Sequence, residues 1–241
     1  MFFLSVPRPG AGAQPQYMAV PAYFLPGSYW SQMAAAGAAL RLAVMNPANG
    51  PGTAPDSEYV AALGAARAAG ITVVGYVHTS YATRSPAAVS ADIDAYYRWY
   101  HMDGIFFDEV STDCADEGYY ASLTGYVKAK GGIARTILNP GTAPRQCYAS
   151  TADILVTFEG SYSQYVTSYA APAWLEHYRA SRFWHVVYAT PSASAMTQVI
   201  ELSKARRAGY VYVTPETLPN PYEVLPGSAF WSAELGAIRS P

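Results

Sequence analysis

Eight short apolar runs alternate with alanine-rich stretches along the chain, and this alternation limits the possible folds more than any other feature. The runs recur at intervals of roughly 20 to 35 residues, which is the spacing of repeated strand and helix units. They cover residues 19–25, 42–46, 72–78, 104–109, 136–139, 154–159, 184–189 and 210–214. Eight such units predict the α/β class and, within it, a single-domain (β/α)8 TIM barrel.

Capping and breaking residues predict the helices between the runs. A polar cap or a proline opens a helix, and a glycine closes it. The signals are Asp56 with Gly70, Ser85 with Pro86, and Gly131 with Gly132, and later helices are expected at residues 172–181, 194–208 and 228–239. The rival architecture, a doubly wound open sheet, normally has a glycine-rich phosphate turn after its first strand. Residues 26–30 read Pro-Gly-Ser-Tyr-Trp instead, so the barrel is favoured.

The composition is that of one folded domain. Hydrophobic residues make up 51% and charged residues 13% of the 241 residues, so a large core is available. No apolar run approaches the roughly 20 residues of a transmembrane helix, and a net charge of −2 gives no broad basic surface for a nucleic acid. Residues 1–17 are expected to be a flexible lead-in and residues 18–241 the barrel domain.

The fourth apolar run ends in two adjacent acids, Asp108 and Glu109, after Gly-Ile-Phe-Phe. Carboxylates at the tip of a buried strand are costly to desolvate, and they are commonly found in clefts where their pKa values can be separated for acid/base work. The alternative is that Asp108 caps the next helix and Glu109 is solvated. Neighbouring side chains on a strand point to opposite faces unless a bulge intervenes, so at most one of the two acids is expected to reach a reacting carbon.

In a barrel the carboxyl ends of all strands converge on one face, so the residues at these ends can be considered together. They include Tyr23, Asn46, Tyr76, His78, Asp108, Glu109, Asn139, Glu159 and Tyr188. Glu159 ends another apolar run, two strands after Asp108, and the pair could flank one glycosidic bond. The chain also has 21 tyrosines, whose flat rings suit sugar stacking. Tyr81 and Tyr162 follow strand tips and are candidate subsite residues.

The histidines and cysteines limit which metal sites and disulfides the chain can form. Of the four histidines only His78 lies at a strand tip, so no zinc spacing is present and no metal site is expected. His78 is then a substrate-contacting, hydrogen-bonding or structural side chain. Cys114 and Cys147, the only cysteines, form either one disulfide or two free thiols; a bridge would join two loops on one face and close a loop of about 33 residues.

Five segments together resemble the signature segments of the spherulin 4 family, glycoside hydrolase family 135. They are residues 46–52 (Asn-Pro-Ala-Asn-Gly-Pro-Gly), 75–81 (Gly-Tyr-Val-His-Thr-Ser-Tyr), 103–109 (Asp-Gly-Ile-Phe-Phe-Asp-Glu), 138–142 (Leu-Asn-Pro-Gly-Thr) and 158–162 (Phe-Glu-Gly-Ser-Tyr). The resemblance implies a (β/α)8 barrel that hydrolyses internal α-1,4 linkages of N-acetylgalactosamine in galactosaminogalactan-type polysaccharide. It places the family's acidic cluster at Asp108, Glu109 and Glu159.

The resulting hypothesis is a retaining endo-glycosidase without a cofactor. Asp108 would be the nucleophile or would stabilise the anomeric carbon, Glu159 would be the general acid/base, and Glu109 would set a pKa or bind a sugar hydroxyl. If the substrate's N-acetyl group is the nucleophile, Asp108 would instead orient that amide. The expected partner is a polysaccharide, and the expected state is a monomer that is secreted, periplasmic or at the cell surface, although no signal peptide is visible.

Three rival functions use the same barrel. The first is a non-catalytic carbohydrate-binding protein of a spore or cyst envelope, which would bind a glycan without releasing reducing ends. The second is a hydrolase of another glycosidic linkage that uses the same acids. The third is a metal-dependent hydrolase, which the placement of the histidines disfavours.

Overall fold

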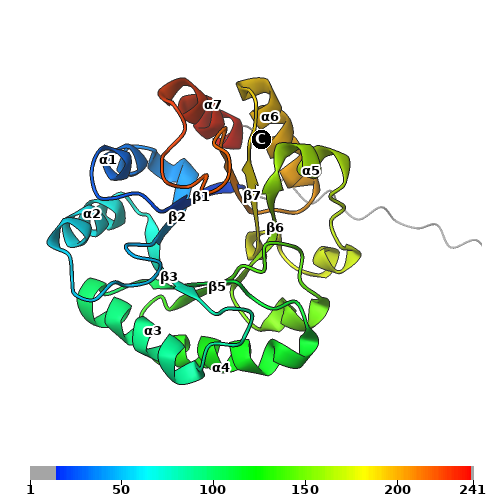
Figure 1. The fold of residues 1–241 in the computed structure, drawn as a ribbon. Helices are drawn as coiled ribbons and strands as arrows, with labels where there is room; N and C mark the ends of the chain where they lie inside the picture. The colour runs from blue at the N-terminus through cyan, green and yellow to red at the C-terminus, as the bar shows by residue number, and fades with distance from the viewer. Residues whose placement is uncertain (1–14, 240–241) are drawn as a thin grey trace, which may run out of the picture.

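A computed structural model describes residues 15–239 of the chain, and these form a closed barrel of eight parallel strands in sequence order. Figure 1 looks along the barrel, with the strands in a ring and the helices around it. The strands are β1 (Tyr17–Ala22), β2 (Leu40–Met45), β3 (Thr72–His78), β4 (Gly104–Asp108), β5 (Arg135–Leu138), β6 (Ile154–Ser161), β7 (Phe183–Tyr188) and β8 (Tyr210–Val213). The predicted single-domain (β/α)8 fold is therefore confirmed.

The helices follow the strands as the capping signals indicate. They are α1 (Ser28–Ala34), α2 (Ser57–Ala68), α3 (Pro86–Tyr100), α4 (Glu117–Lys128), α5 (Tyr162–Thr167), α6 (Ala193–Ala205) and α7 (Ser228–Arg239). Asp56 caps α2 by accepting from the Glu58 amide, and Ser85 caps α3 with Pro86 in its first turn. These caps satisfy backbone donors that a helix start would leave unpaired.

Two connections differ from the expected single α-helix after each strand. The link after β5 contains only the 3-10 helix η3 (Gln146–Ser150) in place of an α-helix. The predicted helix at residues 172–181 is wrong, because that segment forms the short 3-10 helices η4 (Ala173–His177) and η5 (Ala180–Arg182). Tyr178 between them is extended, and this break prevents a continuous helix. The α-helix of that unit is α5, directly after β6.

The barrel interior is filled by aromatic side chains beneath the mouth. Phe106 on β4 packs against Trp184 on β7 with ring centroids 5.7 Å apart, and it stacks with Tyr76 on β3 at 6.1 Å. Phe106 is 2% and Trp184 0% exposed. Because side chains alternate along a strand, a residue two positions after an inward one also faces inward. Asp108 therefore faces the mouth above Phe106.

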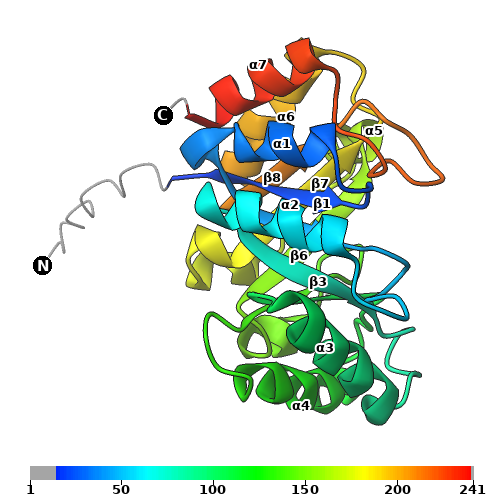
Figure 2. The same ribbon diagram turned by 90° about the vertical axis from the view of Figure 1, so that its left-hand side faces the viewer.

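The ends of the described chain lie away from the mouth. Figure 2 shows the barrel from the side, with the chain entering β1 at one end and the loop between β8 and α7 projecting at the other. Most of the predicted lead-in, residues 1–14, lies outside the described residues. Within residues 15–239, none of the helices has the length and apolar character that crossing a membrane requires.

Candidate active site

A cavity of about 280 Å³ opens at the carboxyl ends of the strands. Its walls are side chains of β3, β4, β6 and β7, of the segments directly after β1 and β2, and of the loop after β8. The lining residues are Tyr23, Asn46, Asn49, Tyr76, Asp108, Glu159, Tyr188, Leu218, Pro219, Asn220, Pro221 and Tyr222. Two carboxylates thus share a small cavity with tyrosine phenols and side-chain amides, which are suitable for hydrogen bonding sugar hydroxyls and stacking on sugar rings.

Asp108 is held in place by the strands on both sides of β4. It is paired in register with His78 on β3, and its backbone oxygen accepts from the Thr79 amide at 2.9 Å and the Thr79 hydroxyl at 2.9 Å. On the other side, Asn139 N donates to Phe107 O at 2.8 Å. The backbone that carries the Asp108 carboxyl is therefore fixed on both sides.

Glu159 faces the cavity because β6 is irregular. Val156 pairs with Trp184 on β7, and the next residue of β7, His185, pairs with Phe158. Thr157 therefore has no partner on β7 and is one residue more than a regular strand would have here. Uninterrupted alternation from the inward Val156 would turn Phe158 inward and Glu159 outward. The extra residue reverses this: Phe158 packs outside against Tyr165 with centroids 4.7 Å apart, and Glu159 lines the cavity. A bulge re-aims the side chains that follow it.

The amide of Asn139 joins the two acids. Its Nδ2 donates to Asp108 Oδ1 at 2.9 Å and to Glu159 Oε2 at 2.6 Å. Its Oδ1 accepts from the Gly141 amide at 2.9 Å, so the NH2 group is the end that faces the carboxylates. Two oxygens bound to one nitrogen cannot be farther apart than about 5.5 Å, the two hydrogen bonds laid end to end.

A tyrosine donates to each acid on its other oxygen. Tyr76 Oη donates to Asp108 Oδ2 at 2.9 Å, and Tyr222 Oη donates to Glu159 Oε1 at 2.6 Å. Burial and the nearby carboxylates raise the pKa of both phenols, so they remain donors at neutral pH. Tyr23 lies between them, with ring centroids 5.4 Å from Tyr76 and 5.7 Å from Tyr222. Each carboxylate is thereby fixed by two donors.

Burial and the charge of Glu159 raise the pKa of Asp108 to about 7. Below about pH 7 Asp108 therefore holds a proton beside Glu159, and above about pH 7 Asp108 is ionised. One proton and one charge are what general acid and nucleophilic or electrostatic catalysis require together.

This raised pKa predicts the alkaline limb of the pH profile. If the pair must retain one proton, kcat/KM is expected to fall as the pH rises through about 7, by about tenfold for each further pH unit. The measurement is kcat/KM on a soluble amino-sugar oligosaccharide between pH 5 and 9, with the fold checked by circular dichroism at each pH. A constant kcat/KM from pH 6 to pH 9 would contradict the shared-proton description.

Glu109 and His78 lie beside the cavity and do not line it. The backbone of Glu109 has φ 52°, a left-handed conformation uncommon outside glycine. This turn directs its carboxylate to His78, with Glu109 Oε2 3.7 Å from His78 Nδ1. His78 Nδ1 also lies 3.2 Å from Ser80 Oγ. The structure therefore separates the adjacent acids, as the alternation argument expects, with Asp108 inside and Glu109 at the rim.

The other predicted sugar contacts divide in the same way. Tyr23, Asn46, Tyr76, and Tyr188 line the cavity, and Asn139 reaches it through both carboxylates. Tyr81 is outside it and 63% exposed, in a turn where residues 80–82 all have positive φ. Tyr162, at the start of α5, donates to Gln198 Oε1 at 2.7 Å. Among residues 15–239, no three His, Cys, Asp or Glu side chains are arranged to hold a metal ion.

Tyr222 is the main site residue that the sequence analysis missed. It lies in Pro-Asn-Pro-Tyr, residues 219–222, well after the last strand. The backbone oxygen of Tyr222 accepts from the Tyr23 amide at 3.2 Å, and the Tyr222 amide donates to Asn220 Oδ1 at 3.3 Å. The loop therefore folds back over the mouth. The only sequence signal is an aromatic residue within a proline-rich turn, and that pattern does not indicate which strand end the loop covers.

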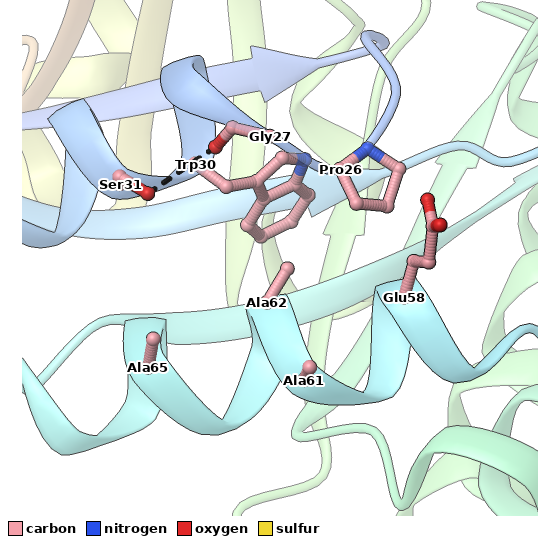
Figure 3. Close-up of a pocket in the computed structure, with 8 residues that line it drawn as sticks. All are labelled: Pro26, Gly27, Trp30, Ser31, Glu58, Ala61, Ala62 and Ala65. Atoms are coloured by element: carbon pink, nitrogen blue, oxygen red, sulfur yellow. Dashed lines mark hydrogen bonds between the residues drawn. The ribbon is translucent and has the colours of Figure 1, made fainter.

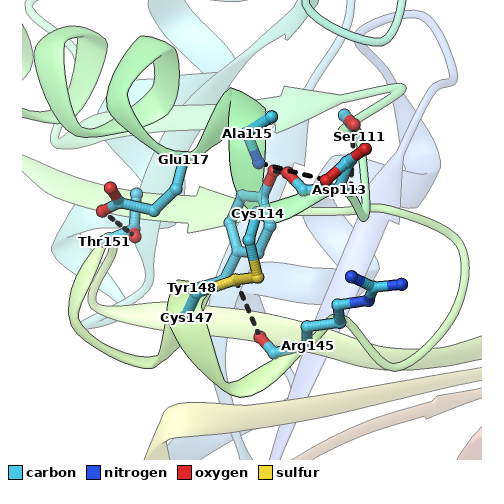
Figure 4. The surroundings of a disulfide bond; sticks show 9 residues. All are labelled: Ser111, Asp113, Cys114, Ala115, Glu117, Arg145, Cys147, Tyr148 and Thr151. Carbon is cyan, nitrogen blue, oxygen red and sulfur yellow. Dashed lines mark hydrogen bonds between the residues drawn. A yellow bond between two sulfur atoms is a disulfide. The ribbon is translucent and has the colours of Figure 1, made fainter.

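A disulfide joins Cys114 to Cys147 (Figure 4). Cys114 lies in the 3-10 helix η2 (Cys114–Asp116) after β4, and Cys147 lies in η3 after β5. These are the loops that follow Asp108 and Asn139. Tyr148, next to Cys147, strengthens the link by donating to Asp113 O at 2.7 Å.

Removing this disulfide is expected to lower the free energy of unfolding by roughly 3.5 to 4 kcal/mol, because a 33-residue loop is then free in the unfolded chain. The test is equilibrium denaturation of the Cys114→Ser, Cys147→Ser double variant beside the oxidised wild type. Reduced wild type is the control and should unfold with the double variant. Equal stability of the oxidised and reduced wild type would show that the bridge contributes nothing.

A second hollow lies outside the barrel and has no part in this site. It is a groove of about 410 Å³ between α1 and α2. Figure 3 shows Trp30 facing Ala61, Ala62 and Ala65, whose small side chains leave the space open. Trp30 is 2% exposed, and its indole donates to Phe24 O at 3.3 Å. The groove has one charged side chain, Glu58, and shares no lining residue with the cavity at the mouth.

Comparison with known proteins gives a consistent family. The model of the spherulation-specific family 4, Spherulin4, matches residues 17–238. Spherulin-4 of Physarum polycephalum is 35% identical over 214 residues, which are 84% of this chain and 64% of that protein. The chain therefore matches less than two thirds of that relative's length.

Solved structures extend the similarity to the whole barrel. The crystal structure of Aspergillus clavatus Sph3 in complex with GalNAc has a TM-score of 0.81 and 25% identity, and the match covers 95% of this chain and 99% of that one. A Rhizomucor miehei chitinase has a TM-score of 0.56 and 13% identity over 93% of this chain and 100% of its own. The chitinase supports the barrel fold alone.

Proposed function

This chain belongs to the spherulation-specific family 4, and from that membership we propose that it is an endo-acting glycoside hydrolase of polysaccharides that contain α-1,4-linked N-acetylgalactosamine. The observation that carries the proposal is the pair Asp108 and Glu159, joined by one amide in a cavity at the barrel mouth. The similarity of the chain to an Sph3 structure in complex with GalNAc supports an amino-sugar substrate.

The spacing of the two carboxylates supports a retaining mechanism. Retaining glycosidases hold their two carboxyl groups about 5 to 5.5 Å apart, whereas inverting enzymes need about 6.5 to 9.5 Å to admit a water molecule. The bridging amide keeps the two nearest oxygens within about 5.5 Å. This distance leaves room for a direct attack on the anomeric carbon and too little for an intervening water.

We assign the attack to Asp108 and the proton transfers to Glu159, so the proton that the raised pKa keeps on Asp108 in the free protein must move to Glu159 before the attack. A nucleophile must keep one position, and Asp108 has a short side chain on a strand that is paired on both sides. The acid/base group must serve first the leaving oxygen and then a water molecule, and the longer side chain of Glu159 can follow both. An Asp108 oxygen forms the bond to the anomeric carbon as Glu159 protonates the departing oxygen; water, deprotonated by Glu159, then releases the sugar.

The test of function is reducing-end release from purified galactosaminogalactan, followed by mass spectrometry of the products. Release of a ladder of internal fragments supports endo-hydrolysis of this polymer. Release from a different glycan alone would keep the hydrolase and replace the substrate. Binding to galactosaminogalactan without release from any amino-sugar polymer would contradict the enzyme and support a carbohydrate-binding envelope protein.

Tyr222 is expected to position Glu159 without contributing to the affinity for substrate. In Tyr222→Phe the ring remains and only the 2.6 Å hydrogen bond to Glu159 Oε1 is lost. We expect kcat to fall by about 10- to 150-fold, since a hydrogen bond to a charged group is worth about 1.5 to 3 kcal/mol, with KM within about twofold of wild type. Steady-state kinetics at several pH values gives both constants. A rise in KM at constant kcat would assign Tyr222 to substrate binding.

A further inference from the structure

A polar cleft of about 400 Å³ lies at the end of the barrel opposite to the mouth. Its lining comes from the amino ends of strands: Arg135 begins β5, Asp153 precedes β6, and Arg182 precedes β7. Lys128, in the last turn of α4, closes one side. In Figure 2 this is the end of the barrel at which the chain enters β1.

Positive charge dominates this cleft. Lys128, Arg135 and Arg182 line it with a single acid, Asp153. Asp153 Oδ2 is already occupied, since it accepts from Lys128 Nζ at 2.5 Å and from the Thr136 amide at 2.8 Å. Asp153 forms an ion pair with Lys128, and although burial opposes it, the hydrogen bond from Lys128 and the charge of Arg135 together lower the pKa of Asp153. Three cations therefore share one acid, and the lining keeps a net positive charge.

Both arginines have N–H groups that are not used in hydrogen bonds within residues 15–239. Arg182 Nη2 donates to Ala152 O, and its guanidinium carbon lies 5.6 Å from the centre of the Tyr178 ring. The half-buried Arg135 guanidinium takes part in none of the hydrogen bonds or ion pairs formed among residues 15–239, although its charge acts on Asp153. An arginine has five N–H donors in a rigid fork, so Arg135 keeps donors that no group among these residues accepts.

Hydroxyl groups complete the lining. Ser150 and Ser181 face the cleft with Thr124 and Thr151. The Thr124 hydroxyl oxygen is buried and has no hydrogen-bond partner in the described part of the chain. Thr151 is already used, because it donates to Glu117 Oε1 at 2.9 Å (Figure 4). Hydroxyl and guanidinium donors thus face one space in which the single carboxylate, Asp153, is already paired with Lys128.

We propose that this cleft is a binding site for a phosphate or sulfate group, held by Arg135 and Arg182 with the hydroxyls of Ser150, Ser181 and Thr124 around it. Guanidinium forks match tetrahedral oxyanions with two parallel hydrogen bonds. A neutral sugar hydroxyl would leave the two arginines uncompensated. The group is either a free ion or an ester on a polymer, and both have the same chemistry. The site is independent of the carboxylates at the mouth and of the proposed reaction.

The direct test is calorimetric titration of the full chain with inorganic phosphate at constant ionic strength, with chloride as the reference anion. We expect saturable binding to wild type and at least about tenfold weaker binding to Arg135→Gln and to Arg182→Gln, since each removes hydrogen bonds to a charged group. Arg145→Gln is the matched control. It makes the same change of charge on an exposed loop outside the cleft and should bind like wild type.

A second arm separates the two sources of the group. Retention on immobilised dextran sulfate that is lost in both cleft variants, with weak binding of free phosphate, would assign the site to an ester on a polymer. Tight binding of free phosphate would assign it to the ion. Binding that is the same in wild type and both cleft variants, or no binding to either probe, would overturn the proposal. Melting curves without phosphate show that the variants are folded, and hydrolysis of the polysaccharide should be unchanged.

Discussion

Glu159→Gln is expected to lower kcat by at least about 100-fold, and Asp108→Asn by about 1,000-fold or more, with both variants folded. Loss of a general acid removes about 10²- to 10⁴-fold of rate, and loss of the attacking carboxylate removes the covalent route itself. Both substitutions keep the size of the side chain and can keep the bonds to Tyr76 and Tyr222. Reducing-end release from the polysaccharide measures the effect. Glu223→Gln, an exposed acid on the loop that carries Tyr222, is the control and should keep wild-type activity.

The two roles can be told apart with an aryl glycoside and azide. A good leaving group needs no protonation, so Glu159→Gln should still complete the first step on a dinitrophenyl substrate. Azide should then attack the covalent intermediate and give a sugar azide with the starting configuration. In Asp108→Asn, azide should replace the missing carboxylate and give the opposite configuration. Exchanged outcomes would exchange the roles, and no azide product from either variant would contradict a covalent intermediate on either acid.

Gly104→Ala is expected to prevent the barrel from closing normally between β4 and β5. Gly104 pairs with Arg135, and a Cβ at this position would be 1.9 Å from Arg135 O and 2.5 Å from Arg135 N. Both contacts are with backbone, so no side chain can move aside. The strands would have to separate at their amino ends, at the end of the barrel opposite to Asp108 and Asn139, and we expect the free energy of unfolding to fall by about 4 kcal/mol or more.

The matched control is Gly125→Ala in α4, where an added Cβ meets no atom within 4 Å. A glycine inside a helix costs roughly 0.5 to 1 kcal/mol relative to alanine, so this variant should be slightly more stable than wild type. Thermal melting of both variants measures the difference, and a loss of 4 kcal/mol corresponds to about 10 °C or more at this chain length. A Gly104→Ala protein that melts with wild type would show that β4 and β5 can separate without cost.

The barrel and half of the catalytic pair follow from the sequence because they depend on local patterns. Asp108 ends a strand whose apolar residues, glycine start and register are all visible in the sequence. Glu159 was also predicted to face the cavity, but the reason was invisible: regular alternation along β6 would have turned it outward, and the extra Thr157 turns it inward. Nothing in Ile-Leu-Val-Thr-Phe-Glu indicates an irregular register.

Contacts between residues far apart in the chain could not be predicted from the sequence. Tyr222 reaches Glu159 across 63 positions of the chain, and the position of its loop is decided by packing on Tyr23 and Tyr212. Tyr81, another predicted subsite residue, does not line the cavity. It follows the tip of β3 as a subsite residue should, but a turn with positive φ carries its ring out to solvent. Loop geometry of this kind depends on the neighbouring loops as much as on its own residues.

The pairing of the strands has a consequence for the catalytic centre. Within residues 15–239, the strand register pairs β1 with β8 at only two positions and β5 with β6 at only two. These two thin seams divide the barrel into a five-stranded sector that carries Asp108 and a three-stranded sector that carries Glu159. The hydrogen bond from Asn139 to Glu159 crosses one seam. The separation of the two carboxylates is therefore set by how the sectors meet, and the cleft around Arg135 and Asp153 lies at the foot of that same seam.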